Sequence, residues 1–400
     1  MAAPPNPLRL LVVTTELSSP PRTGSDVVAL NTLQVLAGRH ELHLVALVND
    51  EPPRLPPGLF TSTQFVRRSL GRVVRLARGV VTRRPFMVAL GESAEMNRAV
   101  DARLRQTPFD AVVLFEWSAI QYCPPRIHPR VVANIEDPPT LKLERKQGLA
   151  VYRPWERARM VVSERLNRDY ERRVLPGLGV VSVLSEDDAE AMRAAGHLNV
   201  RWLPYGVTAQ PASRVGGFAT RRPGTLVITG NMFHLPNVDG VLWFLDEVFP
   251  LVLRAAPHAR LDLVGADPDW RITEAARAFG ERVRVTGRVP DLGVFLKEAV
   301  VSVCPVRLRI GVQTKVLEAL ACGTPVVSTE EGNSGVRGTP GVHLHVASEA
   351  EQQAARIVEL LRGEGWERLS REGHAFAASQ FTWARSAAVL EEHVRAVLPR

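Results

Sequence analysis

The stretch "VVSVCPVRLRIGVQTKVLEALACGTPVVS", residues 300–328, contains one complete unit of strand, helix and strand. It opens with an apolar run that ends at Pro305, which is typical of a buried strand, and it closes on a second such run, "TPVVS". Between them, residues 315–321 have the pattern of a short helix that Gly323 and Pro325 terminate. Two strands joined by a helix indicate an α/β fold with a parallel sheet.

The same alternation runs through the chain and predicts two doubly wound sheets. Further strands are expected at 9–14, 42–48, 111–115, 130–135, 179–185, 224–230, 260–266 and 282–287. Further helices are expected near 27–39, 238–255, 349–362 and 383–398. A stretch rich in Gly, Pro and Ser at 208–224 predicts the domain boundary. We therefore expect an N-terminal domain over 1–207 and a C-terminal domain over 208–380, with a ligand in the cleft outside the carboxyl ends of the strands.

Composition narrows the class of protein. A chain of 400 residues with 45% apolar and 23% charged residues is globular and too long for one ordinary core. Its formal charge of +8 is compatible with anionic partners and identifies none of them. Three widely spaced cysteines argue against a disulfide framework or a zinc site. The N-terminus shows neither a signal peptide nor a membrane span, so we predict a cytoplasmic protein.

The loop at 306–314 has the features of an anion site. Gly311 allows close approach of backbone to a ligand, and Thr314 is expected to cap the following helix. The free amides of that helix start would bind a diphosphate, Lys315 would add a positive charge, and Glu318 could accept both ribose hydroxyls. In the alternative interpretation neither residue binds a ligand: the glutamate only interacts favourably with the helix dipole, and the lysine is solvated. The residues alone support the two interpretations about equally.

"GVQTKVLEALACGTPVVST" (311–329) resembles the donor-binding signature of family 4 glycosyltransferases, which have the GT-B architecture. "VRWLPYGV" (200–207) is similar to the linker of that family. Two further stretches, at 226–252 and 283–299, look most like sugar transferases of exopolysaccharide gene clusters. The resemblance covers nearly the whole chain and is weak at 50–130. It implies two Rossmann-like domains facing across a cleft, with a terminal helix in 381–400 that crosses back to the first domain.

The resemblance also implies site residues. Glu318 should hold the donor ribose, and the N-terminal loop at Gly24 and Ser25 should cover the phosphates. Arg288 and Val289 should lie beside the base. The remaining donor-side positions are Gly230, Asn231, Gly311, Val312, Gln313, Thr314 and Lys315. The implied reaction is a retaining transfer from a nucleotide sugar, with no metal and no cofactor.

This chain departs from the family pattern at several positions. The first glutamate of the family's pair is replaced by Ile310, and the usual Arg–Lys phosphate pair is missing from "TGNMFHLPN" (229–237). Arg307 or Arg309 is a candidate for the missing positive charge. Glu136 and Asp137 stand where relatives often carry a histidine, and we expect them on the acceptor side. Candidate catalytic residues are therefore Glu136, Asp137 and Arg309.

The predicted function is a retaining glycosyltransferase acting on a polysaccharide, glycolipid or natural product. The alternatives are a sugar-nucleotide 2-epimerase of the same fold, which needs no acceptor, and a non-catalytic protein that binds nucleotide sugars. The segment "VRRSLGRVVRLARGVVTRR" (66–84) holds seven arginines and no acid. It is a candidate for peripheral contact with an anionic membrane, although an ordinary surface helix is the simpler interpretation. Nucleic acid is not an expected partner, because no aromatic residues interleave the charge.

Overall fold

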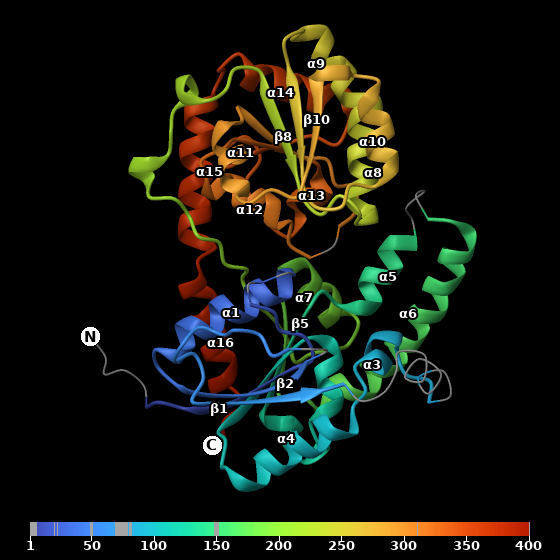
Figure 1. The fold of residues 1–400 in the computed structure, drawn as a ribbon, viewed down its shortest axis with the longest axis vertical. Coiled ribbons are helices and arrows are strands. Elements are labelled where there is room, and N and C mark those ends of the chain that lie inside the picture. Colours follow the sequence, from blue (N-terminus) through green and yellow to red (C-terminus); the bar gives the residue numbers. More distant parts are fainter. Residues whose placement is uncertain are drawn as a thin grey trace. The chain divides into compact units, whose positions relative to one another are not determined.

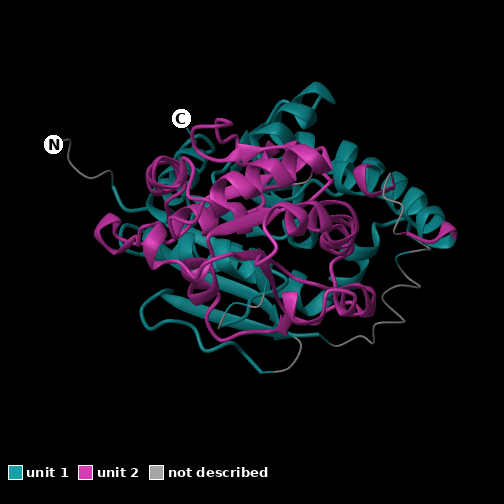
Figure 2. Cartoon of the chain, turned by 90° about the horizontal axis from the view of Figure 1, so that it is seen from above, with its two compact units in different colours: residues 1–144, 155–206, 383–400 teal, residues 145–154, 207–382 magenta. Residues whose placement is uncertain are grey.

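The computed structural model describes residues 6–19, 21, 23–48, 51–68, 79, 82–147, 152–309 and 311–399. The chain divides into two compact units, coloured in Figure 2. Unit 1 comprises 1–144, 155–206 and 383–400, and unit 2 comprises 145–154 and 207–382. The sequence-predicted boundary at 207/208 lies beside this passage from one unit to the other.

Unit 1 is built on a seven-stranded parallel sheet in the order β3-β2-β1-β4-β5-β6-β7. Its strands are β1 Arg9–Thr14, β2 Glu41–Val48, β3 Ser62–Arg67, β4 Ala111–Phe115, β5 Val131–Glu136, β6 Val180–Val183 and β7 Val200–Trp202. Its helices are α1 Gly24–Ala37, α3 Phe86–Leu90, α4 Ala94–Gln106, α5 Pro139–Gln147 (whose last residues fall in unit 2), α6 Pro154–Val174, α7 Glu186–Ala194 and α16 Trp383–Arg395. Short 3₁₀ turns are η1 Trp117–Tyr122, η2 Pro125–Arg130 and η3 Leu175–Gly177.

Unit 2 contains a six-stranded parallel sheet in the order β10-β9-β8-β11-β12-β13 (Figure 1). Its strands are β8 Thr225–Thr229, β9 Arg260–Val264, β10 Val283–Gly287, β11 Val301–Cys304, β12 Val326–Ser328 and β13 His345–Val346. Its α-helices are α8 Leu235–Trp243, α9 Phe249–Ala255, α10 Trp270–Arg277, α11 Leu292–Glu298, α12 Thr314–Ala321, α13 Glu330–Ser334, α14 Ala350–Leu361 and α15 Trp366–Gln380. A π-helical turn, η6 Phe244–Val248, joins α8 to α9, and 3₁₀ turns are η4 Ala212–Arg214, η5 Phe218–Thr220 and η7 Gly280–Arg282.

Continuous apolar runs build both cores. The central strands are buried on both faces, as parallel sheets covered by helices require, and each unit has its own cluster of Val, Leu, Ile and Ala side chains. The last helix, α16, packs on α1 within unit 1, where the hydroxyls of Thr32 and Ser386 are 3.3 Å apart. Trp383 lies against Tyr205, with ring centroids 5.4 Å apart, so it anchors the start of this helix.

The strand order sets where loops gather. In each sheet the chain reverses its direction of travel beside the first strand of the unit, between β1 and β4 in unit 1 and between β8 and β11 in unit 2. Loops that leave such a point diverge to opposite faces of the sheet and open a crevice at the carboxyl ends of the strands. Of the residues predicted to form the site, Gly230 and Asn231 follow β8, and Arg307, Arg309, Gly311, Val312 and Gln313 lie between β11 and α12.

Candidate functional site

The loop from β11 to α12 places the glycine of the donor motif at the reversal point of the second sheet. Gly311 is buried and has a φ of +52°, a conformation that glycine adopts at little cost. A Cβ on Gly335 would come within 2.0 Å of the Gly311 carbonyl oxygen, so two stretches of backbone touch here. Ile310, the notable departure from the family pattern, lies outside the described residues.

The prediction that Thr314 caps α12 is wrong. The capping residue is Gln313, and Thr314 is the first residue inside the helix. Among the described residues no side chain hydrogen-bonds to this helix start as a cap. A threonine one position inside the helix cannot reach back to the first amides as an N-cap does, because its own φ and ψ are already helical. The amides at the start of α12 therefore keep the anion-binding character that the sequence predicts.

Lys315 lies at the centre of the predicted donor residues. Its side chain is buried, and Nζ donates a hydrogen bond of 2.6 Å to Oδ1 of Asn237. The amide of Asn237 in turn donates to the Asn231 carbonyl at 2.8 Å. A Cβ on Gly230 would lie 3.2 Å from Lys315 Nζ, so the loop after β8 runs directly beside the ammonium group. The structure thus brings Gly230, Asn231 and Lys315 together.

Burial shapes the charge of this region. It lowers the pKa of the Lys315 ammonium, with Cys304 and Glu318 acting in the opposite direction. It raises the pKa of the Glu318 carboxyl, against which Lys315 acts. The two side chains are three residues apart on α12 and therefore share one side of the helix. A buried cation whose hydrogen-bond partner, within the part of the chain that the structure describes, is a neutral amide oxygen is suited to a ligand that brings negative charge.

Arg307 and Arg309, the two candidates for the missing positive charge, lie in environments unlike that of Lys315. Arg307 makes a two-pronged ion pair with Asp239, with nitrogen–oxygen distances of 3.0 and 3.1 Å. Its guanidinium also lies 5.6 Å from the ring centroid of Trp243. Arg309 is exposed, as is Arg288 after β10, two strands away from β8 in the sheet order. Val289, Val312, Gln313 and Thr314 are half-buried.

In unit 1 the start of α1 meets the end of β5. Gly24 is the first residue of α1, which Thr23 and Asp26 cap reciprocally. Ser25 Oγ donates a hydrogen bond of 2.5 Å to Glu136 Oε2. Two predicted residues from stretches more than a hundred positions apart are therefore in direct contact. The loop thought to cover phosphates is bonded to the carboxyl group expected on the acceptor side.

Glu136 has an unusual environment. Its φ is +59°, in the left-handed region that few residues other than glycine adopt, and it lies at a register shift between β5 and β6. Glu116, which follows the neighbouring strand β4, has a φ of +80°. Burial and the nearby Glu116 together raise the pKa of Glu136 to about 8. Within the described part of the chain, Glu136 Oε1 is buried with no hydrogen-bond partner.

Glu116 was not among the residues that the sequence analysis assigned to the site. The signal was present, because an acid directly follows each of the adjacent strands "AVVLF" and "VVANI". Asp137 forms an ion pair of 2.8 Å with Lys142. Burial alone would lower the pKa of Lys142, but Asp137, Glu136 and Glu116 raise it. The three carboxyl groups and one ammonium form a compact charged cluster at the carboxyl edge of the sheet.

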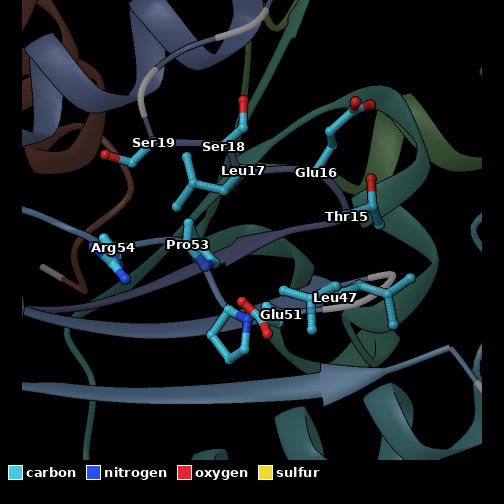
Figure 3. A pocket seen from close by; sticks show the side chains of 11 residues that line it. Thr15, Glu16, Leu17, Ser18, Ser19, Leu47, Glu51, Pro53 and Arg54 are labelled. Carbon is cyan, nitrogen blue, oxygen red and sulfur yellow. The ribbon is translucent and has the colours of Figure 1, made fainter.

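A pocket of about 660 Å³ opens in unit 1 where β1 and β2 end (Figure 3). It is lined by the loop Thr15–Ser19 and by residues 51–54, and no residue of the predicted site lines it. Thr15 Oγ1 lies 2.5 Å from Ser118 Oγ, and Ser18 hydrogen-bonds to Asp26, which caps α1. These contacts join the pocket wall to the α1 start.

The raised pKa of Glu136 has a consequence for stability. Between about pH 4.5 and pH 8 the unfolded chain releases this proton while the folded chain retains it, so stability falls as pH rises through that window. Glu136→Gln removes the ionising group and should flatten the decline, with a gain of up to about 4 kcal/mol near pH 8. The urea concentration at the midpoint of unfolding, measured from pH 5 to pH 8.5, tests this pH dependence of stability. Glu281→Gln, at an exposed glutamate, is the control. The prediction would be contradicted if stability fell equally with pH in the parent chain and in both variants.

No helix in the described part of the chain has the length and apolar character needed to cross a membrane. The same described residues contain no group of three or more His, Cys, Asp or Glu arranged to hold a metal ion. The basic segment 66–84 lies mostly outside the described residues, so its membrane contact stays a prediction. The absence of a metal requirement likewise stays a prediction.

With this geometry in view, residues 223–363 match the family model described as glycosyl transferases group 1. Among curated proteins, a 44.6 kDa protein of the cps region of Klebsiella pneumoniae is 24% identical over 163 residues. That alignment covers 39% of this chain and 42% of the Klebsiella protein. The chain therefore aligns with only about two fifths of that relative's length.

Solved structures match along nearly the whole chain. HepE of Anabaena, crystallised with UDP and glucose, has a TM-score of 0.66 at 11% identity and covers 97% of this chain and 99% of its own. Sucrose-phosphate synthase of Thermosynechococcus elongatus has a TM-score of 0.65 at 16% identity, covering 97% and 98%. WaaG, a glycosyltransferase involved in lipopolysaccharide biosynthesis, has a TM-score of 0.65 at 16% identity, covering 96% and 99%.

These findings confirm the predicted fold, an α/β chain with the two Rossmann-like domains of GT-B glycosyltransferases. The resemblance to glycosyltransferases is confirmed as well, since unit 2 carries the group 1 glycosyltransferase domain. That domain supports the predicted enzyme class, a transferase. It spans the β8 loop, Lys315 and Glu318.

Proposed function

We propose that this protein is a retaining glycosyltransferase that moves a sugar from a nucleotide-sugar donor to a hydroxyl group of an acceptor. The observation that supports it most is the contact between Lys315 and Asn237 inside the group 1 domain. This contact sets a buried cation beside the amides of the α12 start and the Gly230 turn. Such an arrangement fits a diphosphate.

Lys315 takes the place of the missing phosphate-binding pair in this proposal. Arg307 is a weaker candidate, because Asp239 already neutralises it and the two groups would have to separate to serve a ligand. Among the described residues, the hydrogen-bond partner of Lys315 Nζ is the neutral oxygen of Asn237, and burial lowers the pKa of the ammonium group. A diphosphate would offset that cost and favour the ammonium form.

The chemistry follows from these charges. When the bond between the sugar and the nucleoside diphosphate breaks, negative charge develops on the departing phosphate. The backbone amides of Val312 and Gln313 and the ammonium of Lys315 would stabilise that charge in a site of low dielectric constant. Glu318, one turn along α12, would accept hydrogen bonds from the donor ribose. No pair of hydrolytic carboxyl groups is needed in this reaction.

The acceptor would bind to unit 1. We assign this role to Glu136 and Asp137, and add Glu116 because it shares the charged cluster. Glu136 keeps one buried oxygen without a protein partner in the described structure, so it can bond an acceptor hydroxyl. The polar pocket at Thr15–Ser19 is a second part of this proposed acceptor side. Arg309 and Arg288 remain predicted contacts of the reacting sugar and the base.

UDP-sugars are the first donors to test, because HepE crystallises with UDP-glucose. Surface polysaccharide is the first acceptor class to test, given the cps-region relative. A thermal-shift screen of UDP-, GDP-, ADP- and dTDP-sugars should show one base stabilising the protein. Nucleotide release should then require an acceptor. Turnover of the sugar nucleotide without an acceptor would indicate an epimerase, and stabilisation without any turnover would indicate a binding protein.

A further inference from the structure

Helix α6 buries several polar side chains and exposes two large apolar ones. The buried residues of this helix are Met160, Glu164, Asn167, Tyr170 and Glu171, of which three carry charged or amide side chains. The side facing solvent carries Trp155, which is 58% exposed, and Val162, which is 53% exposed. A helix that covers a core normally does the opposite. The exposed apolar residues therefore need an explanation that lies outside the core of unit 1.

The inner side of α6 is fixed by specific contacts, so the helix cannot rotate to bury those residues. Glu171 accepts a hydrogen bond of 3.1 Å from the backbone amide of Thr140, at the start of α5. Tyr170 packs edge-on against Trp117 with ring centroids 5.2 Å apart. Figure 1 shows α6 beside α5, and Arg168 joins the two helices through Glu144.

The residues that we call the outer face of α6 form one stripe at helical spacing: Trp155, Arg159, Val162, Leu166 and Arg173. The guanidinium of Arg159 lies 5.9 Å from the centroid of the Trp155 ring, which keeps the cation and the indole together. Asp169 is exposed within the stripe, three residues after Leu166 and four before Arg173, and Arg165 and Arg172 are exposed at its margin. The outer face of α6 therefore combines exposed apolar side chains with more arginines than acids.

We propose that the outer face of α6 binds an anionic lipid surface. The charges favour this partner, because guanidinium groups bind phosphate with two hydrogen bonds and the cations outnumber the acid. The apolar part favours it too, since tryptophan prefers the level of the lipid headgroups. Two or three apolar side chains are too few for a stable protein–protein interface, which buries about 800 Å² per partner. The proposal rests on unit 1 alone and does not depend on the donor site.

Sedimentation of the full chain with vesicles tests the proposal. The protein should bind phosphatidylcholine vesicles that contain phosphatidylglycerol and should not bind pure phosphatidylcholine, and added salt should weaken the binding. Trp155→Ser combined with Val162→Ser should weaken binding about tenfold, because each loses apolar burial in the headgroup region. Arg159→Glu combined with Arg165→Glu should remove the preference for the anionic lipid.

Trp270→Ser is the matched control, because Trp270 is 73% exposed on α10 of unit 2. This variant should bind vesicles like the parent chain. All three variants alter exposed side chains, so their melting temperatures should stay close to that of the parent. The proposal is overturned if the parent chain ignores anionic vesicles, or if the α6 variants bind them unchanged. It is equally overturned if the α6 variants only abolish self-association, which would make a second copy the partner.

Discussion

Lys315→Met should reduce turnover of the nucleotide sugar by roughly 100- to 1,000-fold while the protein stays folded. The loss follows because the variant removes the buried cation that would stabilise the departing diphosphate. Stability should be unchanged or higher, since methionine fills a similar volume without a buried charge. Nucleotide release with saturating donor and acceptor measures the first effect, and a melting curve measures the second.

Two further variants sharpen this test. Lys297→Met changes an exposed lysine on α11 and should leave turnover intact. Asn237→Ala removes the side chain that positions Lys315 Nζ, so it should lower kcat less than Lys315→Met does and shift the alkaline limb of the pH profile. A Lys315→Met enzyme with full kcat would rule out the proposed role, whatever its melting temperature.

Glu318→Ala should abolish the donor-induced rise in melting temperature. In our proposal its carboxylate accepts the ribose hydroxyls, and losing such a pair of hydrogen bonds costs about 2–3 kcal/mol, or roughly 30- to 150-fold in affinity. The free protein should melt close to the parent chain, because Glu318 is half-buried and burial already disfavours its charged form. Titration of the preferred sugar nucleotide and of its nucleoside diphosphate measures the affinity directly.

Glu298→Ala, an exposed acid at the end of α11, is the control for the change of charge. It should leave donor affinity at the parent value. The two ligands separate the contributions of the nucleotide and of the sugar. The Glu318 variant should lose affinity for the nucleoside diphosphate and for the sugar nucleotide by similar factors, because both contain the ribose. Unchanged affinity for either would remove Glu318 from the donor site.

The architecture was largely predictable because parallel strands buried on both faces give continuous apolar runs. Strand β3 was missed, because "STQFVR" is an edge strand with one buried residue and shows no apolar pattern. Helix α6 was missed for a related reason. Its buried face is mainly polar, so hydrophobic periodicity could not reveal it.

The local placement of Gly311, Lys315 and Glu318 was predictable, since it is set by spacing within one turn and one helix; their role in donor binding stays a proposal. The hydrogen-bond and ion-pair partners of these side chains could not be predicted. Lys315 finds Asn237 across 78 positions and Arg307 finds Asp239 across 68, and a single sequence carries no signal of such pairs. The left-handed backbone of Glu136 also has no local signature, because strands on both sides impose it.

The close packing of backbone on backbone around the donor loops has a consequence for how this enzyme could have diverged. A Cβ on Gly265 would fall 1.7 Å from the Gly230 carbonyl oxygen, just as one on Gly335 would collide with the turn at Gly311. Main-chain contact at glycine, rather than the identity of nearby side chains, thus holds both turns in place. Charged groups can then be exchanged on this frame without moving it, which is compatible with the phosphate-binding role that we propose for Lys315.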